Sequence, residues 1–497
     1  LGYHTTSFGE LDAESDAAAR VFRAAGIAPG DRALLALRPG HDLIVGMYGL
    51  LKAGAVPVAL DPGMGWRTLL RCVARTQPKA LIGIRKATLL SRLPLRELAS
   101  LRTRVTLGDA GWERSLAAAR SRIPGEIHPG SVDETAAILF TSGSTGAPKG
   151  VVYTHGMLDA QVTLVRQTFG IERGEVDLPL LPVFALFNPA LGVTTVTPWM
   201  DPARPAAADP APILGSIRDE RVTTSFGSPT LWDLLARSAE ARNLTLPSLR
   251  RILIAGAPVP PGLLARLARV APNATVHTPY GATECLPVTS IQSAEVISET
   301  GAAARRGEGT CVGRPATGVE IRIVREEDGP IERLKQAVAC ATGEIGEILA
   351  TGPTVTRAYD RNPEATALAK VTDEQGRTWH RMGDLGALDA RGRLWFHGRR
   401  AEKLETADGP LTTESVEPAF ADHPDVRRCA LIGLGPRGRQ RPVLVVEPRH
   451  MPADAAEAKV LADDLRHHAT VNRHAARVAA VVFQSALPTD VRHNAKI

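Results

Sequence analysis

Apolar and polar positions along the chain follow a helical spacing in some segments and form short strand-like runs in others. Residues 9–27 have helical spacing with an acidic first turn and Gly26 near the end, which predicts a helix. A strand is then predicted over 31–37, a helix over 42–54 and a second strand over 55–61. Alternation of this kind predicts an α/β fold with a largely parallel sheet. It recurs through residues 80–140, 213–259 and 262–277.

The pattern changes near residue 344, where segments become short, rich in strand-forming residues and punctuated by turns. We therefore expect a large N-terminal α/β domain, residues 1–397, and a small α+β C-terminal domain, residues 398–497. The predicted elements of the small domain are strands over 427–435, 441–448 and 476–484 and a helix over 455–469.

Composition narrows the class of protein. The 497 residues are too many for one ordinary core, and 44% hydrophobic with 23% charged residues is typical of a soluble globular protein. No apolar run is long enough to span a bilayer, and the first residues lack the basic and apolar regions of a secretory signal. An odd number of cysteines without a CxxC pair predicts reduced thiols in the cytoplasm, with neither disulfides nor zinc. They are Cys72, Cys285, Cys311, Cys340 and Cys429.

The charge is moderately basic, with a formal net charge of +6, and arginines outnumber lysines by 50 to 9. These residues are scattered and lack the aromatic interleaving of a groove for single-stranded nucleic acid. We interpret the arginine bias as the base composition of a GC-rich bacterial genome, and we expect no nucleic-acid partner.

One glycine-rich segment, ILFTSGSTGAPKGVVYTH at residues 138–155, has the composition of a phosphate-binding loop. It departs from the Walker A pattern, because two residues separate Gly146 from Lys149 and Gly150 follows the lysine where Ser or Thr would stand. A Walker loop also continues into a helix, whereas residues 151–153 favour a second strand. The segment therefore predicts a strand–loop–strand hairpin.

The loop offers hydroxyl and N–H donors, a backbone that can close around an anion, and one cation. Its candidate phosphate-binding residues are Thr141, Ser142, Gly143, Ser144, Thr145, Gly146 and Lys149. A surface turn of small residues is the alternative interpretation.

A second glycine pattern, residues 433–438, satisfies G-x-G-x-x-G after a predicted strand. A dinucleotide site needs a helix N-terminus to hold the pyrophosphate. Pro436 and a predicted strand follow instead, so this pattern is excluded as a dinucleotide site.

The segment TSGSTGAPKG, residues 141–150, resembles the phosphate loop of the adenylate-forming superfamily of acyl-CoA synthetases, peptide-synthetase adenylation domains and luciferases. Residues 280–284, Tyr-Gly-Ala-Thr-Glu, are similar to the family motif Tyr-Gly-x-Thr-Glu. The resemblance implies ATP and Mg²⁺ as cofactors, with Thr283 at the α-phosphate and Glu284 at the metal. A carboxylate beside a triphosphate is physically sensible only with a hard cation between them.

Other motifs follow in the family's order and imply the rest of a nucleotide site. Gly256-Ala257-Pro258 resembles the segment along the adenine ring, and Tyr280-Gly281-Ala282 completes the motif before Thr283. Residues 381–386 resemble the motif whose aspartate bonds both ribose hydroxyls, which implies that role for Asp384. Arg399 is similar to the arginine that also reaches the ribose.

Residues 487–496 resemble the C-terminal motif whose lysine neutralises the transition state between carboxylate and α-phosphate, which implies that role for Lys496. The usual preceding glycine is replaced by Ala495, and an ordinary tail lysine is the alternative. In the family the C-terminal domain is a mobile lid, and Gly398-Arg399 resembles the start of its hinge motif. The usual hinge Asp or Lys is replaced within residues 400–402, so the pivot residue stays open.

The superfamily activates a carboxylate by attack on the α-phosphate of ATP, and a second nucleophile then takes the acyl group. Five segments resemble the olefin β-lactone synthetases of bacterial long-chain hydrocarbon biosynthesis: 182–192, 196–205, 280–287, 405–413 and 492–497. This resemblance implies a 2-alkyl-3-hydroxy fatty acid whose own β-hydroxyl closes a β-lactone and releases AMP. It also suggests a complex with pathway enzymes, namely a condensing enzyme and an α/β-hydrolase.

We expect an acyl channel lined by Phe184, Leu186, Phe187 and Trp199, with ordinary core packing as the alternative for each. Two other functions are open. A long-chain acyl-CoA synthetase shares every adenylation motif. A non-catalytic paralogue that binds an acyl-adenylate is disfavoured by the intact Lys149, Glu284, Asp384 and Lys496.

Overall fold

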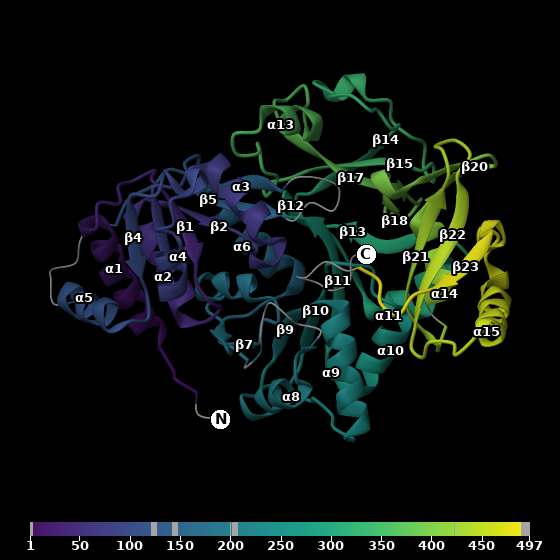
Figure 1. Ribbon diagram of the computed structural model, residues 1–497, viewed down its shortest axis with the longest axis horizontal. Coiled ribbons are helices and arrows are strands. Elements are labelled where there is room, and N and C mark those ends of the chain that lie inside the picture. Colours follow the sequence, from purple (N-terminus) through teal and green to yellow (C-terminus); the bar gives the residue numbers. More distant parts are fainter. Residues whose placement is uncertain are drawn as a thin grey trace. The chain divides into compact units, whose positions relative to one another are not determined.

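A computed structural model describes residues 3–120, 127–141, 148–198, 200, 207–421 and 423–488 of the chain. Predicted site residues 142–147, Trp199 and Lys496 lie outside these ranges. The chain divides into two compact units, Leu1–Thr197 with Pro353–Ala367 and Pro198–Gly352 with Leu368–Ile497 (Figure 1). The boundary expected near Gly398 is a different division of the chain and stays a prediction.

The first unit is built on a six-stranded sheet in the order β4-β3-β1-β2-β5-β6. Strands β1 to β5 pair in parallel, and β6 runs antiparallel to β5. This confirms the α/β class for the N-terminal part of the chain. The strands are β1 (Arg32–Ala36), β2 (Val56–Ala59), β3 (Ala80–Gly83), β4 (Thr103–Thr106), β5 (Thr135–Thr141) and β6 (Lys149–Thr154), with a short parallel pair β7 (Val176–Asp177) and β8 (Thr194–Thr195).

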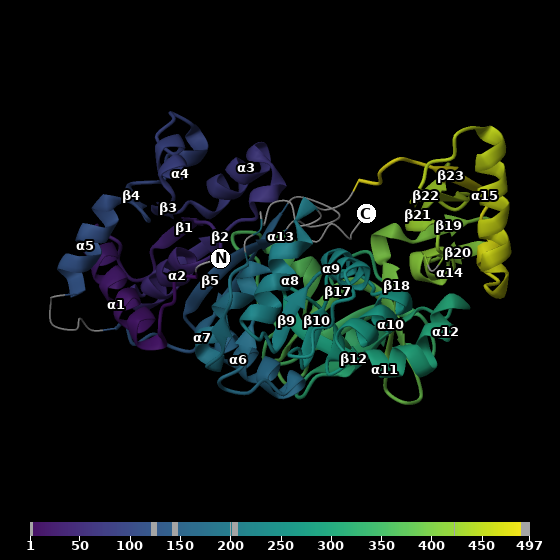
Figure 2. The same ribbon diagram turned by 90° about the horizontal axis from the view of Figure 1, so that it is seen from below.

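Helices cover both faces of this sheet, because successive side chains of a buried strand point to opposite faces. Leu35 of β1 packs with Phe22 and Leu50 in one core cluster, whereas Leu34 packs with Val73 in another. Thus α1 and α2 lie on one face and α3 on the other (Figure 2). The helices are α1 (Phe8–Ala24), α2 (His41–Ala53), α3 (Trp66–Thr76), α4 (Arg85–Leu90), α5 (Ala110–Arg120), α6 (His155–Phe169) and α7 (Asn188–Leu191).

The second unit contains a long mixed sheet in which hydrogen-bonded neighbours follow the order β14-β15-β17-β18-β13-β12-β11-β10-β9, with β16 paired to β17. Strands β9, β10 and β11 are parallel, and the pairings from β11 to β14 are antiparallel. The strands are β9 (Thr224–Gly227), β10 (Arg251–Ile254), β11 (Thr275–Ala282), β12 (Cys285–Gln292), β13 (Thr310–Pro315), β14 (Glu320–Val324), β15 (Gly346–Thr351), β16 (Lys370–Thr372), β17 (Thr378–Leu388) and β18 (Leu394–Arg399).

The C-terminal residues of this unit form a three-stranded sheet, β21-β22-β23, and a hairpin, β19-β20. The four elements predicted after residue 398 are confirmed as β21 (Val426–Leu434), β22 (Arg441–Pro448), α15 (Ala455–His468) and β23 (Ala480–Phe483). The glycine pattern 433–438 lies where β21 turns into β22, so a strand follows it, as predicted. The remaining elements are α8 (Pro210–Asp219), α9 (Pro229–Ala241), α10 (Pro261–Val270), α11 (Ser293–Glu295), α12 (Gly301–Arg305), α13 (Pro363–Ala369), β19 (Leu404–Thr406), β20 (Gly409–Leu411) and α14 (Glu417–Ala421).

Two general features bear on the class of protein. Within the described ranges, no helix is both long enough and apolar enough to cross a bilayer. All five cysteines lie in described segments as free thiols, and four of them are buried.

Candidate active site

The phosphate-loop segment is flanked by the antiparallel hairpin of β5 and β6. The register pairs Leu139 with Val151 and Thr141 with Lys149, so residues 142–147 connect two directly opposed strand ends. This confirms the predicted strand–loop–strand arrangement and excludes the strand–loop–helix of a Walker site. The loop residues themselves, and the side chain of Thr141, lie outside what the structure describes.

The loop's exit is packed against a crossing segment, residues 358–360. The carbonyl of Gly150 accepts a 2.7 Å hydrogen bond from the Asp360 N–H, and Val151 forms an antiparallel bridge with Tyr359. A Cβ at Gly150 would lie 2.9 Å from the Phe140 ring and 3.1 Å from Asp360 Cβ. Only glycine therefore lets β6 lie this close to Phe140 and the crossing segment. The ammonium of Lys149 lies 5.0 Å from the centroid of the Tyr359 ring.

A partly buried ion pair holds this crossing segment in the first unit. Arg32 Nη2 lies 2.7 Å from Asp360 Oδ1, whose side chain is 3% exposed, and Arg32 Nη1 also donates to the Thr76 carbonyl. Tyr359 and Asp360 are not among the residues predicted from the sequence. No local pattern could have indicated the pair, because 328 positions separate Arg32 from Asp360.

In the second unit three predicted nucleotide-binding residues meet. The hydroxyl of Tyr280, on β11, donates a 2.6 Å hydrogen bond to Asp384 Oδ2, and Arg399 Nη1 lies 3.1 Å from Asp384 Oδ1. The antiparallel register of β17 and β18 sets Asp384 opposite Arg399. The Asp384 residue is 3% exposed. The buried carboxylate is therefore held by one hydrogen-bond donor, Tyr280 of β11, and by the charge of Arg399 on the adjacent strand β18.

The electrostatics of these groups follow from burial and from the Asp384 charge. Burial and the adjacent Asp384 carboxylate raise the pKa of Tyr280 well above its ordinary value, so the hydroxyl keeps its proton. Burial lowers the pKa of Arg399, but Asp384 and Tyr280 raise it, and the net shift is upward. Tyr280 therefore remains a hydrogen-bond donor and Arg399 remains a cation.

Thr283 and Glu284 form the turn between β11 and β12, where Ala282 pairs with Cys285. Glu284 is only 9% exposed, which is unusual for a turn carboxylate. A Cβ at Gly281 would lie 2.8 Å from the Cys285 carbonyl oxygen, so the tight hairpin requires glycine there. Thr283 and Glu284 are thus held in a tight turn shortly after Tyr280 in the chain.

The adenine-segment candidates Gly256, Ala257 and Pro258 follow the end of β10 in the same unit. Gly256 has a φ of +103°, a conformation that residues with a Cβ rarely adopt. The chain therefore turns sharply at the carboxyl end of a parallel strand, where α/β proteins commonly bind ligands.

The acyl-channel candidates that the structure describes, Phe184, Leu186 and Phe187, lie in the first unit. Phe184 and Leu186 belong to the short 3₁₀ helix Pro182–Leu186, and the Phe184 and Phe187 ring centroids are 6.2 Å apart. Leu186 packs against the core cluster of α1 and α2, and its carbonyl accepts from the Tyr48 hydroxyl at 2.9 Å. Leu186 thus packs against the core from a partly buried position, and the channel roles of Leu186 and of the two half-buried phenylalanines stay predictions.

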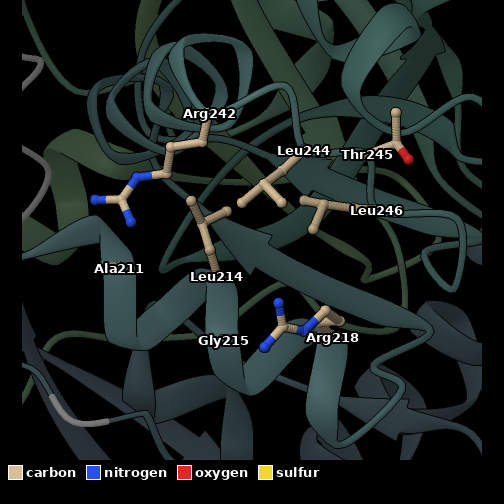
Figure 3. A pocket seen from close by; sticks show the side chains of 8 residues that line it. All are labelled: Ala211, Leu214, Gly215, Arg218, Arg242, Leu244, Thr245 and Leu246. Atoms are coloured by element: carbon tan, nitrogen blue, oxygen red, sulfur yellow. The ribbon is translucent and has the colours of Figure 1, made fainter.

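Two cavities of the second unit contain no predicted site residue. The smaller, about 180 Å³, lies between α8 and residues 242–246, with Leu214, Leu244 and Leu246 inside and Arg218 and Arg242 beside it (Figure 3). The larger, about 950 Å³, is an open cleft beside β17 and β18 that includes Trp395 and His397.

The comparisons with known proteins give the class. Residues 1–360 match the family model described as AMP-binding enzyme, and the chain belongs to that family. Two curated olefin beta-lactone synthetases, from Stenotrophomonas maltophilia and Xanthomonas campestris pv. campestris, are 44% and 45% identical to it. The alignments cover 99% of this chain and 90% and 89% of those proteins.

Among solved structures, O-succinylbenzoate coenzyme A synthetase from Bacillus subtilis in complex with AMP superposes with a TM-score of 0.78. It is 23% identical, and the match covers 99% of this chain and 92% of that one. The fold is therefore that of the adenylate-forming enzymes. Curated relatives named CoA synthases or CoA ligases are more distant, at 26–29% identity.

Proposed function

We propose that this chain adenylates a 2-alkyl-3-hydroxy fatty acid and closes it to a β-lactone. In the first step a carboxylate oxygen attacks the α-phosphorus of ATP, the bond to the bridging oxygen breaks, and pyrophosphate leaves. In the second step the substrate's β-hydroxyl oxygen attacks the acyl carbon, its proton is released, and AMP leaves with the bonding electrons. An internal nucleophile has a high effective concentration, so CoA is not needed.

The observation that carries this proposal is the 44–45% identity to olefin beta-lactone synthetases over 99% of the chain. The buried Asp384 carboxylate, flanked by Tyr280 and Arg399, supports the nucleotide half of the reaction, because vicinal ribose hydroxyls need a fixed acceptor. The lower identity of 26–29% to relatives named CoA synthases or CoA ligases favours lactone closure over thioester formation.

The proposed roles belong to the residues of the family motifs. Lys149 and the loop before it would hold the departing pyrophosphate, Thr283 would contact the α-phosphate, and Lys496 would neutralise the transition state. Asp384 and Arg399 would bind the ribose, and Gly256-Ala257-Pro258 would lie along the adenine. Phe184 and Phe187 would contact the acyl chain.

Glu284 fits the Mg²⁺ that an ATP-dependent reaction of this kind uses. Mg²⁺ commonly takes one or two carboxylates and completes its shell with phosphate oxygens and water. Glu284 is a buried single carboxylate on the turn after Tyr280, and the metal bound there would neutralise phosphate charge. A dedicated cage of several protein carboxylates is not required for such a metal.

We also propose that the protein works in the cytoplasm, which the five free cysteines support. Its candidate partners are a condensing enzyme and an α/β-hydrolase of the same hydrocarbon pathway. Co-purification of the three proteins from the producing cells tests the complex, and their separate elution would contradict it.

The test of the function compares reactions of the purified chain with two acids, without and with CoA. With ATP, Mg²⁺ and a 2-alkyl-3-hydroxy fatty acid, we expect β-lactone, AMP and pyrophosphate without CoA. The matched 2-alkyl acid without the 3-hydroxyl should support ATP–pyrophosphate exchange but give no lactone. A thioester formed with strict dependence on CoA would instead identify an acyl-CoA synthetase.

A further inference from the structure

The side chain of Lys149 has an aromatic neighbour to which the proposed function assigns no role. Its ammonium lies 5.0 Å from the centroid of the Tyr359 ring, within the range of a cation–π interaction. Tyr359 is 5% exposed, so little water competes with the ring for the charge. In the described part of the chain, no carboxylate forms a salt bridge with Lys149.

The ring is held firmly relative to the strand that carries Lys149. Val151 and Tyr359 form an antiparallel bridge, and main-chain hydrogen bonds join Asp360 N–H to the Gly150 carbonyl and Val152 N–H to the Ala358 carbonyl. The Tyr359 N–H also donates to Thr366 Oγ1 at 3.0 Å. Since β6 and the crossing segment are bonded on both sides of the contact, the ring keeps its place beside the lysine.

A ring and a carboxylate would hold this lysine with different consequences. A carboxylate would neutralise the ammonium and compete with phosphate for it. The negative face of an aromatic ring restricts the ammonium without cancelling its charge, so the full charge stays available for an anion. Prior orientation of this kind also lowers the entropic cost of binding.

We propose that Tyr359 is a positioning residue, which holds the Lys149 ammonium for the pyrophosphate that leaves during adenylate formation. This inference rests on the proposed function of Lys149. Pyrophosphate is present only in the first half-reaction. Tyr359 therefore acts on adenylate formation and not on the conversion of a preformed acyl-adenylate, whereas a purely structural role would affect both steps.

The test measures ATP–pyrophosphate exchange and, separately, the conversion of synthetic acyl-adenylate to lactone. Tyr359→Leu is expected to raise KM for ATP and pyrophosphate on the order of tenfold, with conversion of the adenylate retained. Tyr359→Phe, which keeps the ring, should lose far less than Tyr359→Leu. Tyr3→Leu, at an exposed tyrosine, is the matched control and should match the wild type.

A double-mutant cycle with Lys149→Ala isolates the pair. In the Lys149→Ala background, Tyr359→Leu should have no further effect on exchange. An equal effect of Tyr359→Leu in both backgrounds, or a loss in Tyr359→Phe as large as in Tyr359→Leu, would overturn the inference and leave the proposed function intact.

A measurement independent of activity separates the positioning role of Tyr359 from the proposed function of the whole chain. In protein whose lysines carry ¹³C-methyl groups, the Lys149 signal, assigned with Lys149→Arg, should be shifted upfield by the ring. Tyr359→Leu should return it to the position of exposed lysines. Absence of the shift overturns the inference whatever the activity. A shift in a protein without any ATP–pyrophosphate exchange would instead contradict the proposed function, and with it the role given to Tyr359.

Discussion

Tyr280 and Asp384 are 104 positions apart in the chain, yet the tyrosine hydroxyl donates a 2.6 Å hydrogen bond to Oδ2 of the aspartate. The bond joins the end of β11 to the middle of β17, and Arg399 reaches the other carboxylate oxygen. The carboxylate is thus oriented by groups of the protein itself. Preorganisation of this kind makes the pair sensitive to small chemical changes.

We expect Asp384→Asn to reduce ATP–pyrophosphate exchange strongly, because an amide is a poorer acceptor and no longer pairs with Arg399. Tyr280→Phe should raise KM for ATP by about tenfold, since a hydrogen bond to a charged group contributes about 1.5–3 kcal/mol. The double variant should lose less ATP–pyrophosphate exchange activity than the product of the two single losses predicts. Asp463→Asn, at an exposed position of α15, is the control. If the two single losses of exchange activity multiply strictly in the double variant, coupling through this bond is contradicted.

Lys496→Ala is expected to lower the rate of adenylate formation by about 10²–10³-fold, which is typical for loss of one group that stabilises transition-state charge. Binding of ATP should change little, because the proposed role belongs to the transition state. Exchange kinetics and equilibrium ATP binding measure the two quantities. Lys459→Ala on α15 is the matched control. Unchanged exchange in Lys496→Ala would remove the lysine from the catalytic proposal.

The stability of the second unit should fall as the pH rises. Burial raises the pKa of Glu414 to about 7, even though the Thr310 hydroxyl donates to it, and burial together with Glu414 raises the pKa of Glu417 to about 8. Because both folded-state values exceed the ordinary value of 4.5, the folded protein binds more protons than the unfolded chain between these limits. The stabilisation that the two protonated carboxyls give the fold is complete below about pH 4.5 and is lost as the pH rises through 7 and 8.

Denaturant titrations from pH 5 to 9 measure this dependence in comparison with Glu414→Gln. The free energy of unfolding of Glu414→Gln should depend less on pH than that of the wild type. Relative to the wild type, the variant should gain stability toward pH 9, because its amide does not ionise. Glu308→Gln, at an exposed position, should follow the wild type. A free energy of unfolding that rises from pH 6 to 8 in the wild type and not in Glu414→Gln would contradict the assignment.

Removal of one partner from the buried pair of Arg381 and Glu347 should destabilise the fold. The two side chains are 4% and 3% exposed, with Arg381 Nη2 2.7 Å from Glu347 Oε2. Arg381→Gln leaves this buried carboxylate with a longer ion pair, 3.8 Å to Arg400 Nη1, in place of its close partner, at a cost of about 3 kcal/mol. Arg325→Gln removes an exposed arginine whose ion pair is long, and it should cost about 0–1 kcal/mol. Equal free energies of unfolding for the two variants would contradict the argument.

Local patterns in the sequence predicted most of the elements that carry the site. The alternation of strands and helices in the first half, the hairpin around residues 138–155 and the elements after residue 398 are all present in the structure. These predictions succeed because the spacing of apolar residues in a segment, together with its turn residues, decides which element the segment can form. Individual site residues such as Thr283 and Asp384 were identified through motif resemblance, and their roles remain proposals.

By itself, the sequence determined the class of fold, the strand–loop–strand form of the phosphate loop and the identity of the motif residues. Only the tertiary structure decided that Tyr280 and Arg399 orient Asp384, that Arg32 pairs with Asp360, and that Lys149 lies against Tyr359. The reason is physical. Elements follow from spacings of a few residues, whereas these contacts join positions brought together by strand order and register across the sheets, which no local spacing contains.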